Sequence, residues 1–249
     1  HVLAGTFSAL AVLPPVLLIG EPLIARKSRE PVCGPTDEFV FAPRSSLYDQ
    51  RGDLMGASVL YMSMSLDGFI TCPDDGPGNG LGTGGGRLHE WLGEPLSEPP
   101  HFDPPGLSGQ VFAELMATGA VVVGRKAFDY AGHWGGDHHG VPIFVPTRGT
   151  PPKPQSGWVH YVPDAATAMR EAKAAAGQKN VMVHGAGLAQ SLLREGLLDE
   201  LEIHLIPVVL GDGRRLFGAD RIELEPTRVL NAPGVTHVRY RVASRAAIS

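Results

Sequence analysis

Residues 181–196 read VMVHGAGLAQSLLREG, and this stretch decides the fold. The mostly apolar run NVMVHG (180–185) predicts a buried strand, and GLAQSLLREG (187–196) has the spacing of a helix with one apolar face. At the junction stand Gly-Ala-Gly (185–187), where a helix normally begins with a capping side chain such as Ser or Asp. Small residues at this point predict that another group comes close to the backbone.

Similar elements recur on both sides of this stretch. AVVVGR (120–125) predicts a buried strand that runs into a loop, and helices are expected over 111–119 and 165–177. IELEPTRVL (222–230) and GVTHVRYRVA (234–243) predict a closing antiparallel pair. Strands that alternate with helices imply an α/β fold in which helices cover both faces of one mixed sheet.

The first 54 residues differ from the rest of the chain. Residues 2–19 form an uncharged apolar run, but Pro14 and Pro15 interrupt it, which argues against a membrane-spanning helix. We interpret 1–54 as a non-catalytic and poorly ordered extension, and 55–249 as a single domain. A tether to the membrane through the apolar run is kept as a third alternative.

Composition excludes several classes of protein. The chain has 249 residues, of which 43% are hydrophobic, and a formal net charge of −5, so no basic footprint for nucleic acid is expected. Two cysteines cannot build a disulfide framework or a four-thiolate metal site, and a reducing cytoplasm is the expected setting. The histidine-rich segment GHWGGDHHG (132–140) matches no zinc spacing, so no metal is predicted.

Two strand-to-helix junctions are candidate phosphate sites. The first turn of the helix after Gly185 offers free N–H groups, and Gly185 and Gly187 lack the Cβ atoms that would hold a pyrophosphate away. Gly124, Arg125 and Lys126 follow another apolar strand and offer two cations to a phosphate. Together they predict a dinucleotide that carries an extra phosphate. Taken singly, tight helix–sheet packing and a solvated pair of cations explain them as well, and no GxGxxG fingerprint is present.

Three segments resemble the dihydrofolate reductase-like superfamily: MSLDGFI (64–70), VVVGRKAF (121–128) and the long run 181–217. The closer match is the C-terminal reductase domain of the riboflavin-biosynthesis deaminase–reductase, and the likeness covers nearly all of 57–243. This resemblance implies a three-layer domain with a twisted, mostly parallel sheet and antiparallel C-terminal strands. It also implies NADPH as the hydride donor and a homodimer.

The resemblance also implies which residues bind the cofactor. The matching positions are Gly124, Arg125, Lys126, Gly185, Ala186, Gly187 and Leu188. Two residues depart from the family's pattern. Ala186 stands where a second glycine is more usual, and Ala127 replaces a threonine whose hydroxyl commonly helps to hold a phosphate. The loss of that hydrogen bond would weaken cofactor binding or transfer its role to a neighbour.

On the substrate side, the resemblance implies Asp67 as the catalytic residue, which would orient the substrate or relay a proton. An Asp before a Gly is also an ordinary turn former. Trp91 is expected to cap the substrate pocket, or else to pack its ring on the core. The substrate-binding set comprises Gly68, Trp91, Pro207, Leu210 and Gly211.

The sequence therefore favours an NADPH-dependent reductase that transfers a hydride to a small polar heterocycle or carbonyl compound. The resemblance places it near the 5-amino-6-(5-phosphoribosylamino)uracil reductases. The zinc site of the deaminase half, with H-x-E and P-C-x-x-C, is absent from the sequence. The alternative is a non-catalytic nucleotide-binding or regulatory protein on the same fold, which Ala127 and Ala186 favour.

Overall fold

The computed structural model describes residues 55–97 and 101–243. They lie within the unit Pro43–Ser249, the second of two into which the chain divides. The expectations for 1–54 fall outside the described residues. Within the described ranges, no helix has the length and the apolar character needed to cross a bilayer.

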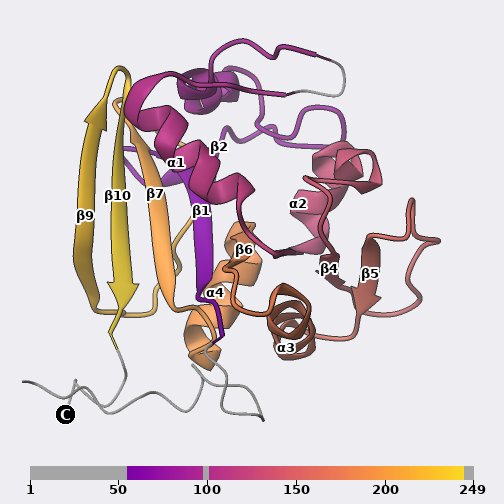
Figure 1. Cartoon of the computed structure of the whole chain (residues 1–249). Coiled ribbons are helices and arrows are strands. Elements are labelled where there is room, and N and C mark those ends of the chain that lie inside the picture. The colour runs from indigo at the N-terminus through magenta and orange to yellow at the C-terminus, as the bar shows by residue number, and fades with distance from the viewer. Residues whose placement is uncertain (1–54, 98–100, 244–249) are drawn as a thin grey trace, which may run out of the picture. The chain divides into compact units, whose positions relative to one another are not determined.

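A sheet of eight strands forms the centre of the described unit, in the order β5-β4-β3-β6-β1-β7-β10-β9 (Figure 1). The strands β5-β4-β3-β6-β1-β7 are all parallel to one another. In contrast, β10 runs antiparallel to β7, and β9 runs antiparallel to β10. The predicted mixed sheet with antiparallel C-terminal strands is confirmed. The bounds are β1 Ser58–Ser65, β3 Ala120–Val123, β4 Ile143–Pro146, β5 Val159–Val162, β6 Val181–His184, β7 Glu200–Ile206, β9 Leu224–Ala232 and β10 Val235–Val242.

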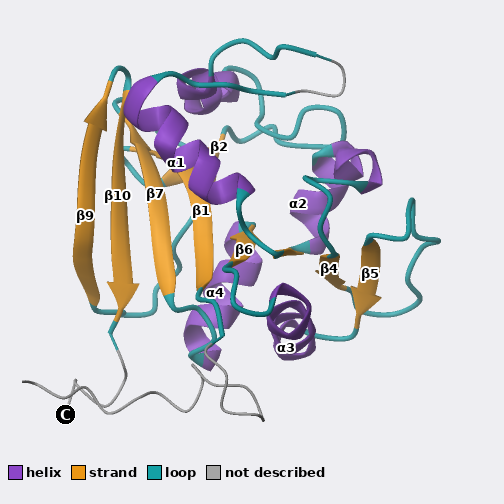
Figure 2. Cartoon of the chain, in the orientation of Figure 1, coloured by secondary structure: helices purple, strands orange, loops and turns teal. Residues whose placement is uncertain are grey.

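Four α-helices cover the two faces of this sheet, so the predicted three layers are also confirmed (Figure 2). Side chains alternate along a strand, and so Leu60 and Tyr61 of β1 enter different core clusters. Leu60 shares its cluster with residues of α3 and α4, whereas Tyr61 packs with Leu115 of α1 and Phe128 of α2. The helices are α1 Gly106–Met116, α2 Arg125–Tyr130, α3 Ala165–Ala176 and α4 Ala186–Glu195.

The glycine-rich stretch after β1 forms short elements that pack beside the sheet. β2 (Phe69–Thr71) pairs with β8 (Arg214–Arg215), and the 3₁₀ helix η1 (Gly85–Leu92) follows. Leu88 and Trp91 of η1 join Ile206 of β7 in a third core cluster. A second 3₁₀ helix, η2 (Gly132–Gly136), lies directly after α2.

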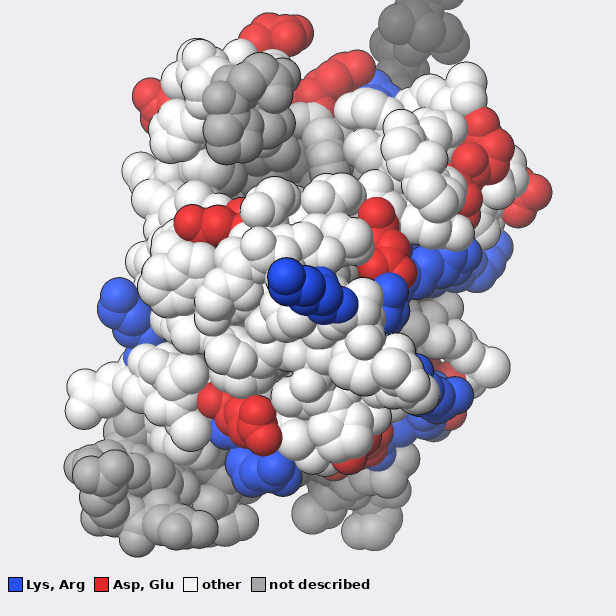
Figure 3. Space-filling model, turned by 90° about the vertical axis from the view of Figure 1, so that its right-hand side faces the viewer, with Lys and Arg blue, Asp and Glu red and all other residues white. Residues whose placement is uncertain are grey.

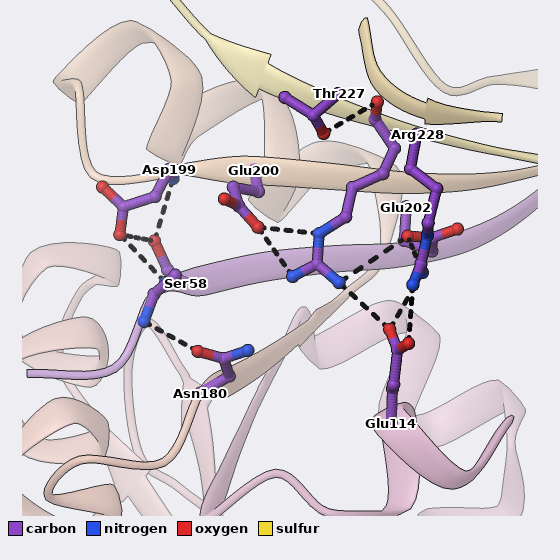
Figure 4. A network of polar contacts seen from close by, with 10 residues as sticks. Ser58, Glu114, Asn180, Asp199, Glu200, Glu202, Thr227 and Arg228 are labelled. Atoms are coloured by element: carbon purple, nitrogen blue, oxygen red, sulfur yellow. Dashed lines mark hydrogen bonds and ion pairs between the residues drawn. The ribbon is translucent and has the colours of Figure 1, made fainter. Parts of the chain in front are cut away.

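Polar networks tie the elements together where the sequence alone shows only scattered charges (Figure 4). The guanidinium of Arg228 donates to Glu114 of α1 at 2.6 Å and to the buried Glu202 of β7 at 2.9 Å. Arg239 of β10 donates from Nε to Glu200 at 2.8 Å and from Nη1 to Glu114 at 3.2 Å. Because Glu114 bridges both arginines, it fastens α1 to the antiparallel part of the sheet.

A second buried network joins β1, β7 and α3. Asp199, just before β7, accepts hydrogen bonds at Oδ2 from the Ser58 amide at 2.9 Å, the Ser58 hydroxyl at 2.8 Å and Lys173 Nζ at 2.9 Å. Burial raises the pKa of Asp199, but Lys173 and the bonds from Ser58 lower it by more, so the pKa lies below its ordinary value. Three donors thus converge on one oxygen of this carboxylate, which fixes the start of β1.

Candidate active site

A cavity of about 1340 Å³ opens at the carboxyl ends of the parallel strands. Its walls include the segments that follow β3 (124–127) and β4 (147–148), the last residue of β6 with the segment after it (184–188), and the start of α3. The carboxyl edge of an open parallel sheet is where α/β proteins bind ligands. The two predicted phosphate junctions therefore face one common space.

The two junctions also pack directly against each other. The Gly124 amide donates to the His184 carbonyl at 3.1 Å. Gly185 has a φ of 97°, and a Cβ built on it would lie 3.1 Å from the Ala127 Cβ, so a side chain there would be strained and crowded. Gly187 is exposed and a Cβ on it would meet nothing within 4 Å. Thus Gly185 serves packing, whereas Gly187 leaves space in front of the helix.

The amino end of α4 presents its backbone to the cavity. Gly185 is its N-cap and no side chain caps it, so the amides of the first turn, including Ala186, Gly187 and Leu188, lack partners within the helix. The side chains of Ala186 and Leu188 are buried in the core, although both residues line the cavity. These uncapped N–H groups and the positive end of the helix dipole favour an anion.

The cations of the β3 junction lie at the start of α2 and line the same cavity. Arg125 donates from Nε to both carboxylate oxygens of Asp129 at 2.8 Å, and its guanidinium lies 5.5 Å from the centre of the Tyr161 ring. Burial raises the pKa of Asp129, but the bonds from Arg125 and His133 lower it by more, which keeps this carboxylate ionised. Arg125 is therefore held in place by a fixed counter-charge.

One face of the molecule carries charges of both signs (Figure 3). Figure 3 shows Lys and Arg interspersed with Asp and Glu on the face to the right of Figure 1. Lys126 is exposed and its Nζ lies 5.0 Å from the centre of the Tyr130 ring. This distribution suits a few cations that serve one ligand better than a broad nucleic-acid surface.

Asp67 lies in the turn after β1, and the residues of the described chain that line the cavity do not include it. Its carboxylate accepts hydrogen bonds from the Ser65 hydroxyl at 2.6 Å, the Gly211 amide at 2.7 Å and the Leu210 amide at 3.1 Å. The bond from Ser65, followed by those from the two amides, lowers its pKa to about 2. Asp67 is thus an ionised acceptor that holds the loop after β7.

The other residues expected on the substrate side divide into two groups. Trp91 lines the cavity, is buried, and donates from Nε1 to Ser63 Oγ at 2.9 Å. Its ring also belongs to a core cluster, as the packing alternative predicts, and its role as a cap over a substrate stays a prediction. Within the described residues, the cavity wall does not include Gly68, Pro207, Leu210 or Gly211.

Several polar residues of the cavity wall were missed by sequence reasoning, among them one serine, one histidine and one arginine. Ser63 and His204 are buried polar residues on β1 and β7, and Arg148 follows β4 at the same edge of the sheet. The histidine within the apolar run of β7 was a signal, because an inward-facing polar residue in a strand needs a partner. Arg148 could have been found from its place just beyond a buried strand.

The histidine-rich segment forms aromatic and hydrogen-bonded contacts. His138 and His139 share a hydrogen bond between their Nδ1 atoms at 2.7 Å, and Trp134 packs edge-on against His138 and His184. Trp134 has a φ of 48°, which is uncommon for a residue with a bulky side chain. In residues 55–97 and 101–243, no group of three His, Cys, Asp or Glu side chains could hold a metal ion.

Solved structures with the same fold have low sequence identity to this chain. A protein from Shewanella sp. PV-4 named for riboflavin biosynthesis has 20% identity and a TM-score of 0.56, over 76% of this chain and 99% of that one. Acinetobacter baumannii RibD has 15% identity and a TM-score of 0.50, over 76% of this chain and 59% of that one. A pyrimidine reductase-like protein from Corynebacterium diphtheriae has 11% identity and a TM-score of 0.51, over 76% and 92%.

At these identities the structures establish a common fold only. No curated protein is significantly similar to the chain in sequence. The sequence pattern of the RibD C-terminal domain, however, matches residues 59–238, which is most of the described unit. The chain therefore belongs to the RibD C-terminal domain family.

Proposed function

We propose that this protein is an NADPH-dependent reductase that transfers a hydride to a small polar heterocycle. The substrate class would be that of 5-amino-6-(5-phosphoribosylamino)uracil, given the family and the riboflavin and pyrimidine names of its structural relatives. One observation carries the proposal. A single cavity is lined by the uncapped amides at the start of α4, by Arg125 with its counter-charge Asp129, and by Trp91.

The residues present fit the diphosphate of a nicotinamide dinucleotide. Gly187 leaves open space in front of the first-turn amides, which would donate hydrogen bonds to phosphate oxygens. Arg125 and Lys126 would supply positive charge from the facing junction, and Arg148 would add a third cation for an extra phosphate. When bound, NADPH supplies the hydride at its nicotinamide ring.

The remaining wall suits a flat, partly polar ring. Trp91, Phe102 and Phe112 enclose that part of the cavity with aromatic surface, and Ser63 contributes a hydroxyl. The volume of about 1340 Å³ exceeds the range of about 300–1,000 Å³ that is usual for one small ligand. Space for a cofactor and a substrate together is what a hydride transfer requires, because both carbons must be held at close distance.

The test uses the full chain with NADPH or NADH and 5-amino-6-(5-phosphoribosylamino)uracil. We expect NADPH binding and consumption of NADPH that depends on the heterocycle. Binding without turnover on this compound or on related heterocycles would favour the rival function, a non-catalytic nucleotide-binding protein, to which Ala127 and Ala186 point. Failure to bind either nucleotide would refute both functions.

We also propose a homodimer, on the family resemblance alone, and a cytoplasmic location. Light scattering on the full chain would give the mass in solution directly. A mass of one chain at concentrations well above those of the assay would refute the dimer. Fractionation of cells that express the chain would test its location.

A further inference from the structure

A row of buried polar side chains crosses the sheet beneath α1. Ser63 of β1, His204 of β7 and His237 of β10 are successive cross-strand partners, so their side chains lie on the same face. Exposure is 2% for His204 and 0% for His237. Ser108 of α1 contacts the row from above, in keeping with the course of α1 over these strands in Figure 1.

Hydrogen bonds run along this row and stop at one atom. His237 Nε2 lies 3.1 Å from Ser108 Oγ, and His237 Nδ1 lies 2.9 Å from His204 Nδ1. His204 Nε2 is buried and has no hydrogen-bond partner in the described part of the chain. Buried polar atoms in folded proteins are rarely left in this state without a reason, such as a ligand.

His204 lines the cavity, although its Nε2 atom is itself buried. The two nitrogens of an imidazole point to opposite sides of the ring, so Nε2 faces away from β10 and toward β1. Ser63 and Trp91 lie there, the Trp91 ring centre is 4.4 Å from that of His204, and all three residues line the cavity. The Ser63 hydroxyl accepts from Trp91 Nε1 and keeps its own proton for a further bond.

The imidazole of His204 is neutral and its tautomer depends on His237. Burial, followed by the proximity of His237, lowers the pKa of His204 well below its usual value. The bond between the two Nδ1 atoms needs one donor and one acceptor. When His237 donates, Nε2 of His204 carries the proton, and when His237 accepts, Nε2 of His204 is bare.

We propose that His204 hydrogen-bonds through Nε2 to a polar heteroatom of a planar heterocyclic substrate, beside Ser63 and under the cover of Trp91. His237 and Ser108 are positioning residues that fix the tautomer of His204. The proposal rests on the proposed function in one respect, that the substrate occupies this cavity. It assigns recognition of the substrate to one side chain. Neither the family match nor the sequence motifs identify that side chain.

The first test observes His204 directly. The full chain, labelled with ¹⁵N histidine and saturated with NADP⁺, is titrated with 5-amino-6-(5-phosphoribosylamino)uracil, so that binding is followed without turnover. We expect the Nε2 resonance of His204 to shift as the probe binds. Probe binding that leaves this resonance unchanged would overturn the proposal. A wild-type chain that binds no probe would instead count against the proposed function, and this inference would fall with it.

The second test uses substitutions. His204→Leu should raise the KM for the heterocycle by about tenfold or more, while the Kd for NADPH stays within about twofold. His204→Gln, which keeps a polar atom near the Nε2 position, should recover part of the loss. His160 is exposed on β5, outside the cavity wall, so His160→Leu is the matched control and should change neither constant. Equal KM values for His204→Leu and wild type would refute the proposal.

The third test separates positioning from packing. Ser108→Ala removes only the hydroxyl at the end of the row, and it should change the ¹⁵N shifts of His204 and raise the KM for the heterocycle. Unchanged His204 shifts in this variant would refute the positioning role. If His204→Leu fails to fold, Ser108→Ala and the wild-type titration still decide the question.

Discussion

Replacing Gly187 by alanine separates the stability of the fold from its capacity to bind a phosphate. Gly187 is the second residue of α4, its φ is not in the left-handed region, and a Cβ built there meets nothing within 4 Å. Alanine is the better helix former, so Gly187→Ala should stabilise the fold by about 0.5–1 kcal/mol. The same methyl group would stand in the space that the proposed diphosphate occupies.

The expected loss of binding follows from the hydrogen bonds at this point. A bond to a charged group contributes about 1.5–3 kcal/mol, so displacing one phosphate oxygen should raise the Kd for NADPH by about 10- to 100-fold. Urea unfolding and calorimetric titration on the same preparation give both quantities. Gly157 is exposed, equally unobstructed and away from the cavity wall, so Gly157→Ala is the control and should leave the Kd unchanged.

The two effects of Gly187→Ala must have opposite signs. A variant that is as stable as wild type or more so, yet binds NADPH with unchanged Kd, would show that the phosphates do not approach α4 at Gly187. A variant that is clearly less stable would contradict the open space in front of this residue. Either result refutes the reasoning.

Four further predictions concern other parts of the chain. Ala127→Thr should introduce a hydroxyl near Gly185 and lower the Kd for NADPH by about tenfold, and a higher Kd in a titration would refute a phosphate near this position. Lys173→Met should cost about 3–5 kcal/mol in urea unfolding, because it leaves the Asp199 carboxylate buried and unpaired. In the wild type, Asp199 has a lowered pKa, so its contribution is present above the ordinary value of 3.8 and is lost as pH falls through the lower folded value, which acid unfolding can follow. Glu114→Gln should cost only about 0.5–1 kcal/mol in the same urea assay, since Glu114 is part-exposed and solvent screens its bridge; a loss as large as that of Lys173→Met would show that the bridge behaves as a buried pair.

Local patterns predicted much of the fold. The helix at 187–196 appears as α4, and the pair at 222–230 and 234–243 appears as β9 and β10. These elements have strong periodicity or length, and one local rule decides each of them. The α2 helix was expected only as a loop with two cations, because six residues are too short to show a helical period.

The candidate site was less accessible to sequence reasoning. Which of two glycines faces a ligand depends on φ and on the neighbouring junction, so Gly185 and Gly187 could not be told apart by their letters. Asp67 matched a motif, yet its bonds to Leu210 and Gly211 span more than 140 positions, a pairing that no local pattern reveals. The partnership of His204 with other strands depends likewise on sheet register.

A crystal structure of the full chain with NADPH would test the central claim most directly. We expect the diphosphate oxygens within hydrogen-bond distance of the amides of Ala186, Gly187 and Leu188, with the Arg125 guanidinium on a phosphate and the nicotinamide ring toward Trp91. Density for the cofactor elsewhere on the protein, or phosphates that contact neither junction, would contradict the account.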